Sequence, residues 1–332
     1  MIMYKVIVTT DYADDQLMNL AKEMLKGKAE IELIACPKEE DLIEKCQDAD
    51  ATLSGYEPFT DKVFAALPKL KLVSILSIGY NFADVDAAKK YGVAVCNNPT
   101  YCVNEVADHT MALLLTLNRR LFNYNAAIKK EHVWSARMEK GNIKRMNTQT
   151  VGLVGFGNIA RRVAARMQAC GCKVIAYDPY VKQEFADQFN VQLVTLDEIY
   201  EQSDMISLHA LLNKETEKLV NREAFEKMAA KKPYLVNCGR GGLIDEDALL
   251  EALQTGKLMG AGLDVFVSET PDLAASPFTK LGDNVILTPH AAFFSDDAAY
   301  EQKVLAVQHI IDFFEGRGDK VPVLNGIRSP KA

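Results

Sequence analysis

The chain alternates short apolar runs with amphipathic stretches, and it does so in two separate series. Runs rich in β-branched residues that alternate with helical patterns predict parallel strands joined by right-handed helical crossovers. Helices must then cover both faces of each sheet, because central parallel strands are apolar on both sides. The sequence therefore predicts an α/β protein that contains two doubly wound parallel sheets.

The predicted strands fall on either side of a central helical and polar region. In the first series they cover residues 4–9, 31–34, 51–54, 72–76 and 93–96, with helices over 14–25, 39–46 and 84–91. In the second series they cover residues 151–154, 174–177, 205–209, 234–237, 260–265 and 285–288. Most strands of the second series are wholly apolar, as central strands of a parallel sheet should be.

A long helical pattern begins the region between the two series. Asn104 is a suitable N-cap with Glu105 in the first turn, and apolar residues then recur at helical spacing to about Ala127. We expect one continuous helix here, followed by a polar segment over residues 129–149.

A last helix is predicted after the second series. Ser295 is its expected N-cap and Gly316 its expected stop. The tail over residues 321–324 has the pattern of a short strand.

Charge and composition exclude several classes of protein. The 38 basic and 45 acidic side chains leave a net charge of −7, which argues against nucleic acid or a membrane surface as the main partner. The apolar run at residues 111–117 is too short to span a bilayer, and the N-terminus reads as a strand rather than a signal peptide. The seven cysteines are scattered, which favours reduced thiols over disulfides or a zinc site. We expect a cytoplasmic protein.

A glycine motif follows the first strand of the second series. Gly155, Gly157, Asn158, Ile159 and Ala160 lie in a strand–turn–helix context, where the glycines permit a tight turn and close approach of a pyrophosphate. The N-terminus of the following helix offers amides and a positive dipole end to phosphates. The pattern predicts a dinucleotide site.

An acidic residue follows that motif at the end of the next strand. Asp178 is placed to accept from the ribose hydroxyls of NAD, and its charge disfavours the extra phosphate of NADP. Arg161 and Arg162 lie just past the motif and keep NADP open as an alternative.

His290 follows the last strand of the second series, at the edge of the sheet where open α/β sheets bind ligands. A histidine at a strand end is by itself more often structural than catalytic. Polar segments follow two other strands, at residues 237–242 and 264–269, and these make a reacting site at this edge the better interpretation.

Residues 155–160, 237–242, 264–269 and 288–292 together resemble the D-isomer-specific 2-hydroxyacid dehydrogenase family, and the resemblance covers essentially the whole chain. Residues 177–180, 209–213 and 288–295 are most similar to the branch that contains the C-terminal binding proteins, which are NADH-binding transcriptional corepressors with the dehydrogenase fold.

The resemblance implies a role for each residue of the reacting site. His290 would donate a proton to the substrate during reduction. Glu269 would hold the imidazole of His290 and favour its protonated form. Arg240 would bind the carbonyl and carboxylate oxygens of the 2-oxo acid. Asp264 would accept a hydrogen bond from the nicotinamide carboxamide. The cofactor would also be lined by Thr110, Asn237, Cys238, Gly239 and His209, although a structural role for His209 and a purely packing role for Cys238 remain open.

The substrate loop departs from the family pattern. The family resemblance places Ser77, Ile78 and Gly79 against the substrate, but Asn81 and Phe82 replace the family's usual Asp and Asn, and the loop is uncharged. This loop and the absence of a regulatory domain after residue 332 disfavour phosphoglycerate as substrate.

Other residues bear on the substrate through the same resemblance. Glu269, rather than an amide partner for His290, counts against formate oxidation, and Thr270 stands where the family usually has proline. Phe293 and Phe294 occupy positions where the corepressor branch carries aromatic residues, so we expect a 2-oxo acid with apolar or thioether bulk. Hydroxypyruvate or glyoxylate is the alternative substrate.

The expected protein is thus an NAD-dependent D-2-hydroxyacid dehydrogenase with its active site in the cleft between two lobes, and an NADH-sensing binding protein is the alternative. Residues 1–103 and 295–332 are expected to form a flavodoxin-like substrate-binding domain, and residues 104–294 a Rossmann-like NAD-binding domain. The family implies a homodimer through the NAD-binding domain, where Trp134 lies in a segment that often forms an arm between subunits. No metal site is expected.

Overall fold

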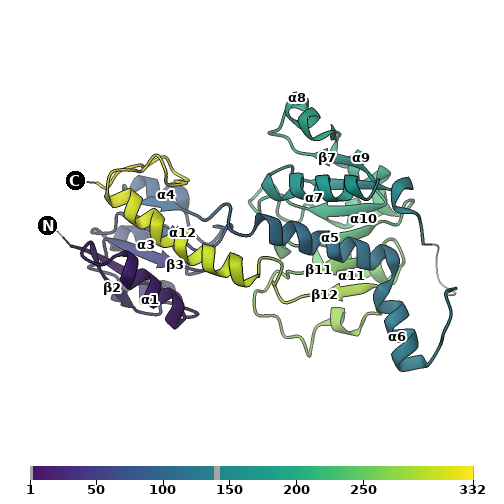
Figure 1. Cartoon of the computed structure of the whole chain (residues 1–332), viewed down its shortest axis with the longest axis horizontal. Helices are drawn as coiled ribbons and strands as arrows, with labels where there is room; N and C mark the ends of the chain where they lie inside the picture. The colour runs from purple at the N-terminus through teal and green to yellow at the C-terminus, as the bar shows by residue number, and fades with distance from the viewer. Residues whose placement is uncertain (1–2, 138–142, 332) are drawn as a thin grey trace. The chain divides into compact units, whose positions relative to one another are not determined.

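The computed structural model describes residues 3–137 and 143–331 and contains two compact units, each built on its own parallel sheet (Figure 1). The first unit comprises Met1–Cys102 and Ser295–Ala332, and the second comprises Val103–Phe294. The chain therefore leaves the first unit once and returns to it. The prediction of an α/β protein with two doubly wound sheets is confirmed.

The first unit contains a five-stranded parallel sheet in the order β2-β1-β3-β4-β5. Its strands are β1 (Tyr4–Val8), β2 (Ala29–Leu33), β3 (Ala51–Ser54), β4 (Leu72–Ile75) and β5 (Ala94–Cys96). Its helices are α1 (Asp15–Met24), α2 (Glu39–Lys45), α3 (Asp61–Ala66), α4 (Val85–Lys90) and α12 (Asp296–Phe314).

The helices of the first unit cover both faces of its sheet, because the strands are apolar on both faces. One face packs against α1 and α12, which lie side by side in Figure 1, and this core includes Val6, Leu53, Val307 and Ile310. The other face packs against α2, α3 and α4 through residues such as Ile7, Phe64 and Val73. The predicted cap of α12 is confirmed, since Ser295 Oγ accepts from the Ala298 amide at 3.0 Å.

The second unit contains a seven-stranded parallel sheet in the order β12-β11-β10-β9-β6-β7-β8. Its strands are β6 (Thr150–Val154), β7 (Lys173–Tyr177), β8 (Gln192–Leu193), β9 (Met205–Leu208), β10 (Tyr234–Asn237), β11 (Gly260–Leu263) and β12 (Val285–Leu287). β6 pairs with β7 on one side and with β9 on the other, so the strand order reverses at β6.

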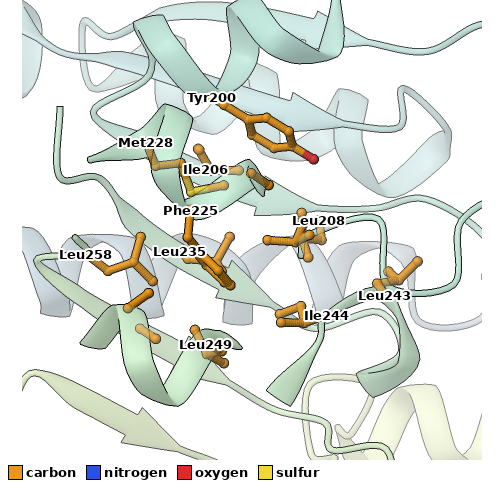
Figure 2. Packing of buried hydrophobic residues seen from close by; sticks show 14 of the residues in the cluster. Tyr200, Ile206, Leu208, Phe225, Met228, Leu235, Leu243, Ile244, Leu249 and Leu258 are labelled. Atoms are coloured by element: carbon orange, nitrogen blue, oxygen red, sulfur yellow. The ribbon is translucent and has the colours of Figure 1, made fainter. Parts of the chain in front are cut away.

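Helices also cover the sheet of the second unit. They are α5 (Val103–Arg119), α6 (Leu121–Glu131), α7 (Asn158–Ala169), α8 (Gln183–Ala186), α9 (Leu196–Gln202), α10 (Arg222–Met228) and α11 (Glu246–Gln254). α5 packs against α7 and against β10 and β11. Figure 2 shows a buried cluster between the sheet and the helices α9, α10 and α11, with Tyr200, Phe225, Leu235 and Leu249 among its members.

The predicted continuous helix over residues 104–127 is wrong in two respects. The helix begins at Val103, so Asn104 lies in its first turn and is not the N-cap. The structure divides it into α5 and α6 at Arg120, whose φ of 54° lies in the left-handed region. Helical periodicity continues through this position because the side chains of both helices keep apolar faces. A single residue in a left-handed conformation leaves no trace in that pattern.

Two smaller differences concern chain ends and edges. The tail at residues 321–324 forms no strand, and its only ladder contact in the described structure is an antiparallel bridge between Val323 and Cys96. Pro322 lacks the amide that a continuing ladder would need. The short helix α3 and the two-residue edge strand β8 were not predicted, because such short segments carry too little periodicity.

Within the described residues, no helix is both long enough and apolar enough to cross a bilayer.

Candidate active site

The glycine turn lies where the strand order of the second sheet reverses. Gly155 follows β6 and His209 follows the neighbouring strand β9. Helices that leave two adjacent strands in opposite directions open a crevice at the carboxyl ends of those strands, which is where open α/β sheets bind ligands. The topology therefore places the predicted dinucleotide motif at a ligand-binding edge.

Gly155 can only be glycine for two independent reasons. Its φ is 89°, a left-handed conformation that side chains with a Cβ rarely adopt. A Cβ built on Gly155 would also lie 2.7 Å from the carbonyl carbon of His209. The turn is thus packed directly against the backbone that follows β9.

The N-terminus of α7 fits a phosphate group. Its N-cap is Gly157, which has no side chain to accept from the first amides of the helix. A Cβ at Gly157 would meet no atom of the described chain within 4 Å, so protein packing does not require glycine there. Asn158 and Ile159 form the first turn of α7. Space and unsatisfied amides are what a pyrophosphate needs.

Thr110 supplies a second observation that fits a cofactor. It lies on α5, its side chain is fully buried, and its Oγ1 atom has no hydrogen-bond partner among the described residues. A buried hydroxyl without a partner is costly, and a bound polar group would satisfy it. The glycine turn and Thr110 together therefore fit the dinucleotide that the sequence predicts.

Asp178 follows β7 and is tied to the glycine turn. Its Oδ2 atom accepts from the Phe156 amide at 2.8 Å, and its Oδ1 atom accepts from the Tyr180 amide at 2.9 Å. Arg161 is held elsewhere, because its guanidinium stacks over the rings of Phe185 and Phe189. The acid next to the turn is therefore oriented by the backbone.

Glu269 and His290 form a directly hydrogen-bonded pair. His290 Nδ1 lies 2.8 Å from Glu269 Oε2, although the two residues follow different strands, β12 and β11. This hydrogen bond, with a smaller contribution from the charge of Arg240, lowers the pKa of the Glu269 carboxyl below its usual value. Glu269 is therefore ionised at neutral pH and can hold one ring nitrogen of His290.

The loop after β10 carries Arg240. The side-chain amide of Asn237 donates to the Arg240 carbonyl at 2.9 Å, and its Oδ1 atom accepts from the Gly239 amide at 3.0 Å. A Cβ on Gly241 would lie 1.9 Å from the carbonyl carbon of Phe266, so this loop packs tightly against the loop after β11. That close packing brings the Arg240 loop next to the segment that leads to Glu269.

Asp264 anchors the segment that carries His290. Its Oδ1 atom accepts from the Thr288 hydroxyl at 2.5 Å and from the Ala291 amide at 2.8 Å, and its Oδ2 atom accepts from the Ala292 amide at 3.0 Å. His290 itself adopts a φ of 52°, a left-handed conformation that is unusual for a residue with a Cβ. The fully buried Asp264 carboxylate thus stabilises the strained turn at His290.

Sequence reasoning missed the part that His109 plays in this network. His109 lies on α5, and its Nε2 atom is 3.0 Å from the Thr288 hydroxyl that donates to Asp264. The sequence indicated only a histidine beside apolar positions of a helix. Its partner is distant in sequence, so no local pattern could reveal the contact.

Two predicted cofactor residues, one partly buried and one buried, are neutral at physiological pH. Desolvation lowers the pKa of His209 to about 4, and its Nε2 atom lies 2.9 Å from the Ser207 hydroxyl. Burial raises the pKa of the Cys238 thiol to about 12, so this cysteine is not a reactive thiolate.

Phe293 packs close to His290. The two rings make an edge-to-face contact with centroids 6.1 Å apart, and the Phe294 side chain is largely exposed. An apolar surface therefore borders the imidazole within the second unit.

The predicted substrate loop belongs to the first unit and follows β4. Ser77 Oγ donates to the Gly79 carbonyl at 2.7 Å, and the side-chain amide of Asn97 donates to the Ile78 carbonyl at 2.7 Å. These bonds fix the backbone of the loop without using a charged side chain.

Comparison with protein families identifies the second unit. The model of the D-isomer specific 2-hydroxyacid dehydrogenase family, NAD binding domain, matches residues 111–292, which is more than half of the chain. The match contains the glycine turn, Arg240, Glu269 and His290.

Curated relatives carry the names of 2-hydroxyacid dehydrogenases. A D-3-phosphoglycerate dehydrogenase from Mycobacterium leprae is 38% identical over 279 residues, which are 83% of this chain and 51% of that protein. A glyoxylate reductase from Korarchaeum cryptofilum is 34% identical over 286 residues, which are 85% of either protein. The chain spans about half the length of the phosphoglycerate dehydrogenases it matches.

Solved structures of similar proteins cover nearly the whole chain. A D-lactate dehydrogenase from Aquifex aeolicus, complexed with NAD and lactic acid, matches with a TM-score of 0.85 and 30% identity, and the match covers 97% of this chain and 99% of that one. A glyoxylate reductase from Paecilomyes thermophila matches with a TM-score of 0.83 and 26% identity, over 94% and 95% of the two chains.

Proposed function

Because this chain belongs to the D-isomer-specific 2-hydroxyacid dehydrogenase family, we propose that it is an NAD-dependent oxidoreductase that interconverts a 2-oxo acid and its D-2-hydroxy acid. The observation that carries the proposal is the hydrogen bond between Glu269 and His290, with Arg240 on the adjoining loop. The pair supplies a proton donor, and Arg240 supplies a cation for an anionic substrate.

His290 transfers the proton in this reaction. Glu269 holds Nδ1, so Nε2 is the atom that gives a proton to the carbonyl oxygen during reduction and takes one from the hydroxyl during oxidation. The ionised Glu269 carboxylate holds the imidazole through Nδ1 and so fixes the orientation of the ring.

Arg240 binds the substrate. Its planar guanidinium presents two parallel donors, which match the carboxylate and carbonyl oxygens of a 2-oxo acid. The Asn237 side chain is hydrogen-bonded to the backbone of both Gly239 and Arg240, so the loop that presents the guanidinium is preorganised.

The nicotinamide cofactor would be held by residues of the second unit. The turn at Gly155 and Gly157 and the first turn of α7 would hold the pyrophosphate, Asp178 the ribose, and Thr110 and the loop 237–239 the remainder. The cofactor supplies the hydride when it is bound. Asp178 supports NAD over NADP, because its negative charge opposes a 2′-phosphate and Arg161 is engaged with two phenylalanine rings.

The first unit would bind the substrate. Ser77, Ile78 and Gly79 are fixed by hydrogen bonds at the carboxyl end of β4, and the loop carries no charge. In the second unit, Phe293 beside the imidazole independently favours a 2-oxo acid with an apolar side chain. Glyoxylate and hydroxypyruvate are the competing substrates, since a glyoxylate reductase is 34% identical over 85% of the chain.

A substrate panel tests the proposal. NADH or NADPH consumption is measured with glyoxylate, hydroxypyruvate, 3-phosphohydroxypyruvate, pyruvate and 2-oxo acids with branched or thioether side chains. We expect turnover with NADH and the highest kcat/KM for a bulky apolar substrate. A higher value for glyoxylate would overturn the apolar preference, and tight NADH binding without turnover of any acid would instead indicate an NADH-sensing protein.

We also propose a homodimer formed through the second unit. α6 and the residues after it expose five large apolar side chains, Leu121, Phe122, Ile128, Val133 and Trp134, and Trp134 is 90% exposed. Exposed apolar side chains concentrated in one short segment support an interface. Sedimentation of the native chain should show a dimer that Phe122→Asp weakens, whereas Tyr180→Asp, at an exposed ring on another segment, should leave it intact.

All seven cysteines are unbridged thiols in the structure, which supports the proposal of a cytoplasmic location.

A further inference from the structure

Two cysteine thiols of the first unit are in direct contact. Cys36 Sγ lies 3.9 Å from Cys46 Sγ, within the range of a sulfur hydrogen bond. Cys36 follows β2, and Cys46 is the C-cap of α2. The nine residues between them include α2, and they bring the chain back next to Cys36. We propose that Cys36 and Cys46 form a redox-active dithiol that is oxidised to an intramolecular disulfide by exchange with a small disulfide such as oxidised glutathione.

Geometry favours bond formation between these two atoms. The thiols already touch, and a disulfide requires the sulfur atoms to approach to about 2.05 Å. The backbone at both ends is held in place: the Cys36 amide donates to the Thr9 carbonyl at 2.8 Å, and the Cys46 amide donates to the Leu42 carbonyl at 3.1 Å. The backbone hydrogen bonds of the fold therefore keep the two sulfur atoms in contact.

The hydrogen bonds give the two thiols different roles. The Cys36 thiol donates to the Ile34 carbonyl at 3.1 Å, which leaves its sulfur lone pairs to accept from Cys46. This hydrogen bond from Cys46, aided by the charge of Lys45, lowers the pKa of the Cys36 thiol, whereas the same contact and burial raise the pKa of Cys46. Cys36 is therefore the attacking thiolate and Cys46 the resolving thiol.

The oxidation consists of two successive thiol–disulfide exchange steps. The Cys36 thiolate attacks one sulfur of oxidised glutathione, forms a mixed disulfide and releases one glutathione thiolate. Cys46 then attacks the Cys36 sulfur, releases the second glutathione and loses its proton to water. Two protein thiols are oxidised to one disulfide, and one oxidised glutathione is reduced to two thiols.

The position of the pair determines how the oxidant reaches it. Both cysteines are fully buried, but they lie next to the seven-residue helix α2, in which Glu44 is exposed, as are the flanking residues Lys38 and Gln47. Leu42 is the only buried residue of α2. Local opening of α2 therefore exposes the pair without unfolding the sheet, and oxidation is expected to be slow but confined to these two thiols.

The test is a redox titration of the full-length native chain. The protein is equilibrated with glutathione buffers of increasing oxidised fraction, thiols are alkylated under acid-quenched denaturing conditions, and the products are mapped by mass spectrometry. We expect a cross-linked peptide that joins Cys36 to Cys46 and an intact mass about 2 Da lower, since two hydrogen atoms are lost. Cys96 is the internal control, because it is equally buried in the same unit and its thiol contacts Ser74 rather than a cysteine.

The outcomes that contradict the proposal are equally specific. Full alkylation of Cys36 and Cys46 in the most oxidising buffer would overturn it. Parallel loss of the Cys96 thiol would show that unfolding, rather than a defined dithiol, exposes the cysteines, and it would overturn the proposal as well.

Two conservative variants test the assigned roles. Both Cys36→Ser and Cys46→Ser should abolish the cross-link, and serine keeps a hydrogen-bonding hydroxyl at each position. Cys46→Ser should accumulate a mixed disulfide with glutathione at Cys36, whereas Cys36→Ser should leave Cys46 unmodified. The opposite pattern would reverse the roles, and the cross-link in the native chain remains the primary readout if either variant fails to fold.

Discussion

His290 shows how single residues of this site are positioned by others. Its imidazole is held by Glu269, and its backbone turn is held by Asp264 through three donors of the segment 288–292. Each of these acids therefore acts on His290 in a different way. Glu269 controls the ring nitrogen, and Asp264 controls the left-handed turn.

The first prediction concerns proton transfer. His290→Ala should lower kcat by about 10² or more, because the substitution removes the imidazole that Glu269 holds as the proton donor. The dissociation constant for NADH, measured by fluorescence, should stay nearly unchanged. Glu269→Gln keeps a hydrogen-bonding partner without the charge, and it should lower kcat by less than His290→Ala does. An unaltered kcat in His290→Ala would remove this histidine from the proton-donor role.

The second prediction concerns cofactor choice. Asp178→Asn preserves an acceptor for the Phe156 amide but removes the negative charge next to the turn. The preference for NADH over NADPH, as a ratio of kcat/KM values, should fall by about tenfold, which corresponds to about 1.4 kcal/mol of differential binding. Glu201→Ala, at an exposed position of α9, serves as the control and should keep the native ratio. An equal ratio in both variants would mean that Asp178 does not face the ribose.

At the scale of elements, the turn between β6 and α7 combines two glycines with different reasons for being glycine. Gly155 is required by the fold, since it has a positive φ and touches the backbone after β9. Gly157 has a φ of −76°, and a Cβ there would meet no described atom within 4 Å. Only a ligand would then make the second glycine necessary.

The third prediction separates these two reasons. Gly155→Ala should destabilise the chain by about 1–3 kcal/mol in urea unfolding, because alanine is strained at this φ and its Cβ overlaps the His209 backbone. Gly157→Ala should cost less, about 0.5–1 kcal/mol, because alanine is a poorer N-cap than glycine but its Cβ meets no described atom, yet it should weaken NADH binding. If Gly157→Ala bound NADH with native affinity, the pyrophosphate would not lie against this turn.

The division of the long helix at Arg120 also belongs to the element scale. The break gives α6 a direction of its own and leaves its large apolar side chains exposed. A continuous helix would have carried the same residues along the axis of α5. The exposure of these side chains on α6 thus depends on one left-handed residue.

At the scale of the whole molecule, each unit contains a neutral histidine whose pKa is lowered by desolvation. His209 in the second unit and His309 in the first both have a pKa lowered to about 4, in each case mainly by burial. An unfolded chain protonates histidine near pH 6.5, so between pH 6.5 and 4 the unfolded state binds more protons than the folded state. Stability must therefore fall as the pH drops through this window.

The fourth prediction follows from that linkage. Lowering the pH from 7.5 to 5.5 should reduce the free energy of unfolding by about 1 kcal/mol for each of the two histidines. Urea unfolding of His309→Asn, followed at both pH values, should show a smaller loss than the native chain. A loss of the same size in the variant would show that His309 is already protonated in the folded state or does not titrate in this range.

The sequence by itself determined the α/β class, the two parallel sheets and the residues that meet at the carboxyl ends of the second sheet. These features are periodic or local: apolar strands repeat along the chain, Gly155 and Asp178 each follow a strand directly, and His290 lies three residues after the end of another. Because the carboxyl ends of parallel strands share one edge of a sheet, local position was enough to bring them to the same edge.

Only the tertiary structure decided which side chains touch. The contact of His109 with Thr288, the three donors on Asp264, the left-handed residue at Arg120 and the Cys36–Cys46 pair all depend on packing between segments or on one backbone angle. Periodicity reports which face of an element is apolar, but a hydrogen bond requires atoms placed to within a few tenths of an ångström. That precision arises when the elements pack, and no local pattern in the chain records it.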